Sequence, residues 1–131
     1  MPIVDHLSVG VPDIAEARKF YDPVMAAVGA KCLVAADSIA AYGTDRVEFI
    51  VILPFDGRAP TGGNGTHIAL TAASRSAVDA AYRAALDHGG ADEGAPGPRA
   101  AYPIPDVYTG YVRDPFGNKL EVIHNGFSVQ A

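Results

Sequence analysis

The chain has a single cysteine, no tryptophan and no long apolar run, and each shortage excludes a class of protein. With Cys32 alone, one chain forms neither an internal disulfide framework nor a thiolate zinc cluster, so any metal must be held by histidines and carboxylates. No stretch approaches the roughly 20 apolar residues of a membrane helix. The first residues, MPIVD, lack the basic and apolar regions of a signal peptide. We therefore expect a cytoplasmic protein with no membrane partner.

Basic residues are scarce as well. The 10 Lys and Arg residues are outnumbered by 15 Asp and Glu residues, and the formal net charge is −5. Because no basic cluster is available to release counterions from a phosphate backbone, we expect no nucleic-acid partner. A length of 131 residues, of which 49% are hydrophobic, is enough for one domain with its own core. The expected partner is a small-molecule substrate.

Periodicity predicts a first unit made of a strand, a helix and three strands. Residues 3–11 alternate between apolar and polar side chains, as a strand does. A helix is expected from Asp13, which can cap it, to a stop at Gly29. Because Pro23 removes a backbone donor from this helix, we expect a kink or a restart there. The remaining strands are expected at 31–36, 39–42 and 47–53.

A second unit of the same order follows a linker rich in glycine and proline. Its last two strands are joined by the turn D-P-F-G-N, and a long loop rich in glycine, proline and alanine precedes them. The elements are expected at 66–72 (strand), 76–88 (helix), 94–105 (loop), 109–113 and 119–124 (strands).

An internal repeat supports the division into two units. His6 and His67 are 61 residues apart, and the sequences that begin with them, HLSV and HIAL, agree. Near the end of each unit, VEFI at 47–50 matches LEVI at 120–123. The chain is therefore read as one α+β domain, with module one at about 1–54, a linker at about 55–64 and module two at about 65–126.

A pseudo-twofold axis between the modules would bring equivalent strand positions face to face. Two imidazoles and two carboxylates at such positions form a site for one divalent ion, and the sequence does not choose among Ni, Co, Zn, Mn and Fe. The alternative is that the histidines are packing or surface residues and that the carboxylates point outward. Burying a carboxylate without a partner is costly, so an inward Glu121 implies a cation or a hydrogen-bond donor. The candidate ligands are His6, Glu48, His67 and Glu121.

Aromatic and basic residues flank the long loop of module two. The tyrosines can line the mouth of a pocket, and the arginine can hold an anionic group of a substrate. Half-buried packing and an ordinary salt bridge are the alternatives. These candidate substrate-binding residues are Tyr102, Tyr108, Tyr111 and Arg113.

Four segments resemble the vicinal oxygen chelate superfamily, which contains glyoxalases, bleomycin-resistance proteins and extradiol dioxygenases. They are DHLSVGVPD at 5–13, FYDPV at 20–24, GNGTHIAL at 63–70 and YVRDPFGNKLEV at 111–122. The resemblance implies paired βαβββ modules that form a curved mixed sheet with a central cleft. It also implies a homodimer. By the same resemblance, the metal ligands are His6, His67 and Glu121, with Glu48 as the additional ligand of glyoxalase I enzymes.

Membership of such a family does not by itself set the reaction. The resemblance implies a divalent-metal-dependent lyase or isomerase similar to glyoxalase I, in which the metal binds neighbouring oxygens of a small substrate and Glu121 or Glu48 moves the proton. The basic residues with which glyoxalase I proteins contact glutathione are not recognisable here. One alternative is a metal-free binding protein similar to bleomycin-resistance proteins, and a third is an extradiol-type dioxygenase.

Overall fold

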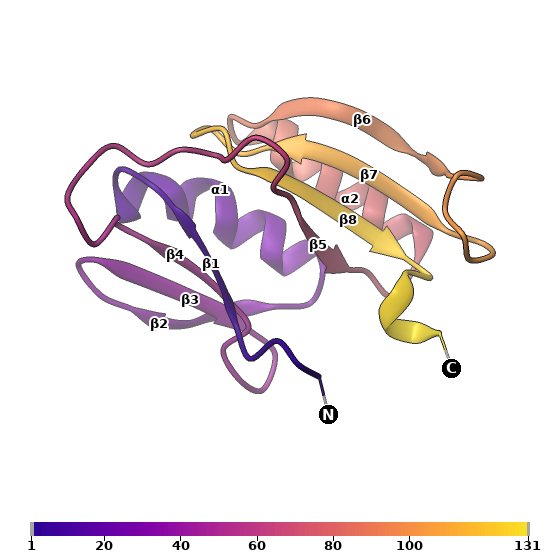
Figure 1. The fold of residues 1–131 in the computed structure, drawn as a ribbon, viewed down its shortest axis with the longest axis horizontal. Helices are drawn as coiled ribbons and strands as arrows, with labels where there is room; N and C mark the ends of the chain where they lie inside the picture. Colours follow the sequence, from indigo (N-terminus) through magenta and orange to yellow (C-terminus); the bar gives the residue numbers. More distant parts are fainter. Residues whose placement is uncertain (1, 131) are drawn as a thin grey trace.

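The computed structural model describes residues 2–130 and consists of two βαβββ modules, as the sequence predicts (Figure 1). Module one contains β1 (Leu7–Gly10), α1 (Ile14–Ala27), β2 (Lys31–Ala35), β3 (Ile39–Gly43) and β4 (Phe49–Ile52). Module two contains β5 (Ile68–Thr71), α2 (Arg75–Asp87), β6 (Ala91–Pro98), β7 (Tyr108–Arg113) and β8 (Lys119–His124), followed by a 3₁₀ helix (Phe127–Val129). The predicted α+β class is confirmed.

Each module forms its own four-stranded sheet, and the two sheets have equivalent strand orders. The order is β1-β4-β3-β2 in module one and β5-β8-β7-β6 in module two. In both, the first strand pairs in parallel with the last strand, and the other pairs are antiparallel. The sheets lie beside each other in Figure 1 but do not join, so β1 and β5 are edge strands of separate sheets rather than neighbours in one curved sheet.

Both helices begin at a residue whose side chain caps them. The carboxylate of Asp13 accepts a hydrogen bond from the Glu16 amide at 2.8 Å, and the Ser74 hydroxyl accepts one from the Ala77 amide at 3.1 Å. α1 continues through Pro23 to Ala27, so the predicted restart does not occur. Its apolar stripe is buried, and this packing offsets the loss of one backbone hydrogen bond.

One hydrophobic core spans both modules. Phe20 and Tyr21 of α1 are fully buried in the same cluster as Val51 of β4 and Leu120 of β8. The helices also pack against each other across the module boundary. The two modules therefore share a buried hydrophobic cluster, although the chain contains two sheets.

The largest differences from the sequence prediction are at β6 and β1. The segment 94–105 is not one long loop, because β6 runs to Pro98 and pairs with β7 through a ladder that is irregular around Gly94. Gly94 adopts a φ of +148°, which glycine tolerates without a steric penalty. β1 begins at Leu7 rather than at residue 3, because its partner β4 begins opposite it at Phe49.

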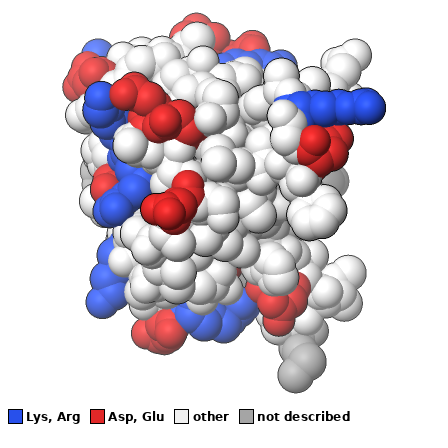
Figure 2. Space-filling model, turned by 90° about the vertical axis from the view of Figure 1, so that its left-hand side faces the viewer, with Lys and Arg blue, Asp and Glu red and all other residues white. Residues whose placement is uncertain are grey.

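On the face shown in Figure 2, Lys and Arg side chains are intermixed with Asp and Glu, and no continuous basic area is visible. Within residues 2–130, none of the helices has the length and apolar character needed to cross a membrane.

Candidate metal and substrate site

The hairpin of β7 and β8 places a carboxylate on the face of the second sheet that is turned away from α2, which we call the outer face. Val122 packs with Val78 and Ala81 of α2, so the neighbouring position on β8, Glu121, points to the outer face. There it lies between Ala69 of β5 and Tyr111 of β7. Glu121 is only 1% exposed.

Three side chains hydrogen-bond the buried carboxylate. Its Oε1 lies 3.1 Å from Nε2 of His67. Its Oε2 accepts hydrogen bonds from the Tyr102 hydroxyl at 2.5 Å and from the Thr109 hydroxyl at 2.6 Å. Among the described residues, no buried side-chain nitrogen or oxygen lacks a partner. Burying a carboxylate without partners costs free energy, and these three hydrogen bonds offset that cost for Glu121.

Two tyrosines extend this network away from the sheet. Tyr102 comes from the loop between β6 and β7, and its hydroxyl lies 2.8 Å from that of Tyr111. Because Tyr102 donates to Glu121, Tyr111 must donate to Tyr102. Burial raises the pKa of Tyr102, and the hydrogen bond to Glu121 raises it further. Burial also raises the pKa of Tyr111. Both phenols are therefore protonated hydrogen-bond donors at neutral pH.

Thr109 is the member of the network that sequence reasoning missed. It is fully buried, and its hydroxyl also lies 3.0 Å from the Val122 carbonyl. The signal was available in the D-P-F-G-N turn, since a hairpin closed there pairs Tyr111 with Glu121 and puts Thr109, two residues earlier, on the same face.

His67 and Glu121 meet the spacing that two ligands of one metal ion require. Two ligand atoms about 2.1 Å from a shared ion, at about a right angle, are about 3 Å apart. Nε2 of His67 and Oε1 of Glu121 are 3.1 Å apart, and the His67 side chain is 43% exposed. However, no group of three or more His, Cys, Asp or Glu side chains within residues 2–130 is placed to hold a metal. One chain therefore presents two of the expected ligands together.

The other two expected ligands lie elsewhere in module one. His6 immediately precedes β1, its side chain is 53% exposed, and its Nδ1 lies 2.7 Å from Oδ1 of Asp5. This contact lowers the pKa of Asp5. Glu48 immediately precedes β4 and lines a separate cavity.

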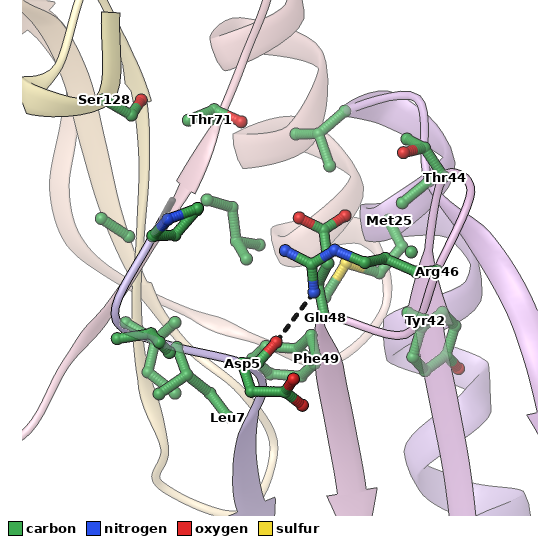
Figure 3. Close-up of a pocket in the computed structure, with 18 residues that line it drawn as sticks. Asp5, Leu7, Met25, Tyr42, Thr44, Arg46, Glu48, Phe49, Thr71 and Ser128 are labelled. Atoms are coloured by element: carbon green, nitrogen blue, oxygen red, sulfur yellow. Dashed lines mark hydrogen bonds between the residues drawn. The ribbon is translucent and has the colours of Figure 1, made fainter.

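That cavity has a volume of about 510 Å³ and lies among the N-terminal segment, the end of α1 and β5. Figure 3 shows Glu48 and Arg46 pointing into it, with Arg46 donating a hydrogen bond to the Asp5 carbonyl at 2.8 Å. Most of the remaining wall is apolar, including Val4, Leu7, Met25, Phe49 and Leu70. Glu48 thus faces an apolar cavity rather than the His67–Glu121 pair.

Of the candidate substrate-binding residues, Tyr102 and Tyr111 join Glu121. Tyr108 instead faces α2, where its hydroxyl donates to Asp79 at 2.7 Å. Arg113 shares the outer face, but its guanidinium donates to Glu93 at 2.6 Å and to the Gly117 carbonyl at 2.7 Å. Its charge is therefore already matched by a carboxylate.

Comparisons with known proteins agree on one family. The sequence model of the Glyoxalase/Bleomycin resistance protein/Dioxygenase superfamily matches residues 3–122. The chain is 33% identical to a glyoxalase/bleomycin resistance protein from Albidiferax ferrireducens T118, with a TM-score of 0.85 over 95% of this chain and 100% of that one. A glyoxalase-related enzyme from Fulvimarina pelagi is 16% identical, with a TM-score of 0.73 over 95% and 89%. The second likeness supports the fold alone. No curated protein matches the chain significantly.

Proposed function

Because the chain belongs to the glyoxalase/bleomycin resistance protein/dioxygenase superfamily, we propose that it is a cytoplasmic, divalent-metal-dependent lyase or isomerase similar to glyoxalase I. Its substrate would be a small molecule with two neighbouring oxygens. The observation that carries this proposal is the His67–Glu121 pair, in which a half-exposed imidazole lies 3.1 Å from a buried carboxylate. A mixed nitrogen and oxygen ligand set suits the divalent ions Ni, Co, Zn, Mn and Fe.

The side chains around this pair have separate roles in the proposal. A divalent ion, when bound, supplies a Lewis acid for the substrate oxygens. His67 would hold it through Nε2 and Glu121 through Oε1. Tyr102 and Thr109 hold the other oxygen of Glu121 and so fix the orientation of the carboxylate. We assign proton transfer to Glu121 and no step to Glu48, because Glu48 faces the separate cavity.

The third ligand, His6, is proposed to come from a second copy of the chain in a homodimer. His6 is exposed next to β1, an edge strand with no partner along one side within residues 2–130. Around it, Ile3 is fully exposed, Val4 is 50% exposed and Leu7 is 40% exposed. Unpaired strand edges and exposed apolar side chains favour association with another chain. The same association would bring His6 to the incomplete pair of the partner.

Metal binding tests the proposal without knowledge of the substrate. Untagged wild-type protein should bind about one divalent ion per chain, and affinity should fall as the pH is lowered, because the ligands must shed protons to bind. His67→Ala should bind more than tenfold more weakly. His88→Ala is the control, because His88 caps α2 and its Nδ1 lies 2.8 Å from the Ala84 carbonyl. A wild-type protein that binds no ion, or a His67→Ala variant that binds as well, would contradict the proposal.

The reaction type is tested separately. The metal-loaded protein should convert the hemithioacetal of methylglyoxal and glutathione with at least one of Ni, Co, Zn and Mn. If metal binds but no turnover is seen with any of these ions, the glyoxalase I assignment is rejected while the metal site stands.

The separate cavity favours a second candidate, a metal-free binding protein similar to bleomycin-resistance proteins. A volume of about 510 Å³ falls within the range of small-molecule pockets, and the walls are mostly apolar. Such a protein needs no metal ligands, so a wild-type chain that binds no ion but does bind an apolar small molecule would favour this candidate.

A further inference from the structure

The register of β7 and β8 places two cationic residues next to Glu121 on the outer face. Tyr111 pairs with Glu121, and Arg113 pairs with Lys119, so all four side chains lie on the same face. Successive residues on one face of a strand are about 7 Å apart. A small molecule held at His67 and Glu121 is therefore within reach of the Arg113–Lys119 row.

Of these two cations, only Lys119 is free to bind a ligand. Arg113 is paired with Glu93 at 2.6 Å. The Lys119 ammonium forms no ion pair with any residue in 2–130 and lies 5.2 Å from the centre of the Tyr111 ring. That contact with the aromatic face steadies the ammonium but leaves its N–H donors available.

The nearby Arg99 is occupied in a different way. Its guanidinium donates hydrogen bonds to the carbonyls of Ala95, Gly97 and Pro98, at 3.0 to 3.4 Å. These bonds hold the β6–β7 loop, so Arg99 has a structural partner for its donors, whereas Lys119 has none.

We propose that Lys119 binds an anionic group of the substrate, while the substrate's neighbouring oxygens are held at His67 and Glu121. This inference rests on the proposed function and deepens it by naming the class of substrate. The substrate carries a chelating pair of oxygens at one end and a carboxylate or similar anion at the other. Because the chain carries a net charge of −5, such an anion needs a local cation, and Lys119 supplies it.

Two hydroxamates test the inference, since both chelate a metal through neighbouring oxygens and only one carries the additional anion. Acetohydroxamate has no carboxylate, and succinohydroxamate has one at the end of a two-carbon chain. Calorimetric titration of the metal-loaded protein should show about tenfold tighter binding of succinohydroxamate. This preference should shrink as the salt concentration rises, because the pair is partly exposed.

Variants of Lys119 separate the anion contact from the metal. Lys119→Met should bind acetohydroxamate as wild type does and lose the preference for succinohydroxamate, whereas Lys119→Arg should keep it. Lys31→Met, which changes an exposed lysine on β2 of the other sheet, is the matched control and should keep the preference. Equal affinity of wild type for the two hydroxamates, or an unchanged preference in Lys119→Met, overturns the inference alone. Failure of both hydroxamates to bind, together with no metal binding, overturns the proposed function.

Discussion

Glu121 is a carboxylate that is 1% exposed, and its hydrogen-bond donors, rather than solvent, hold it in place. Tyr102 and Thr109 hold one oxygen, and His67 contacts the other. A carboxylate held at one oxygen presents the second in a fixed direction, which is what a metal ligand requires. The geometry of the site therefore depends on the uncharged side chains of Tyr102 and Thr109 as well as on the proposed ligands.

Removing the Thr109 hydroxyl should weaken this arrangement. Thr109→Val keeps the shape of the side chain but leaves the Glu121 oxygen one donor short in a buried position, so the free energy of unfolding should fall by about 1–3 kcal/mol. Urea unfolding measures this. Thr71→Val, the same change at an exposed position of β5, should alter stability by less than about 0.5 kcal/mol. Equal effects of the two substitutions would show that the hydroxyl does not support the carboxylate.

At the scale of elements, the turn between β7 and β8 connects module two to α1. Asp114 in this turn is buried and accepts a hydrogen bond from the hydroxyl of Tyr21 in α1 at 2.6 Å. Asn118 in the same turn donates to the Gly10 carbonyl at the end of β1. These bonds fix where β8 begins and therefore where Glu121 lies.

Tyr21→Phe should lower the free energy of unfolding by about 1–3 kcal/mol at neutral pH, because Asp114 loses a buried donor. Burial and the neighbouring Asp114 raise the pKa of Tyr21 well above its usual value of about 10, so the folded state keeps a proton that the unfolded state loses in alkali. The contribution of the Tyr21 hydroxyl to the free energy of unfolding is therefore fully present below about pH 10 and falls as the pH rises further. Above that pH, the stability of Tyr21→Phe should therefore fall less steeply than that of the wild-type protein.

The control for this prediction is Tyr82→Phe. The Tyr82 hydroxyl also donates to an aspartate, Asp92, but at an exposed position. Unfolding curves recorded between pH 7 and 11 should show little change for Tyr82→Phe. If Tyr21→Phe is as stable as wild type at neutral pH, the contact with Asp114 does not connect the modules.

The sequence predicted those elements whose pattern is local. The strand expected at 119–124, after the D-P-F-G-N turn, is β8 with its observed bounds, and Asp13 caps the first helix as expected. The second helix was expected from residue 76 and begins at Arg75. β6 was missed because its glycines, prolines and alanines have low strand propensity, and its pairing with β7 is what makes it a strand. Local composition does not contain that information.

The candidate site was predictable only within module two. His67 and Glu121 lie together because β5 and β8 are hydrogen-bonded neighbours, and the repeat identified both residues. His6 did not join them, because the expectation assumed that the two sheets face each other across an axis within one chain. Instead, Ile68 and Leu70 of β5 pack against the core that contains α1, and β1 and β5 remain edges of separate sheets.

At the scale of the whole molecule, each complete metal site of the proposed dimer requires two chains. Light scattering should therefore give a dimer, with twice the 13.6 kDa mass of the chain. In a twofold dimer, each His67–Glu121 pair would receive His6 from the other copy. If the ligands come from two chains, a chain that lacks His6 and a chain that lacks His67 can together form one intact site. A metal site within one chain would not be restored in this way.

A mixed dimer of His6→Ala and His67→Ala chains tests this account most directly. The two chains would carry different tags that contain no histidine, and the mixed dimer would be purified through both tags in turn. One of its two sites combines the intact His67 and Glu121 of the first chain with the intact His6 of the second. Calorimetric titration should therefore show one divalent ion per mixed dimer, bound as tightly as by wild type, while each variant alone binds weakly. A mixed dimer that binds metal no better than its parents would contradict the shared site.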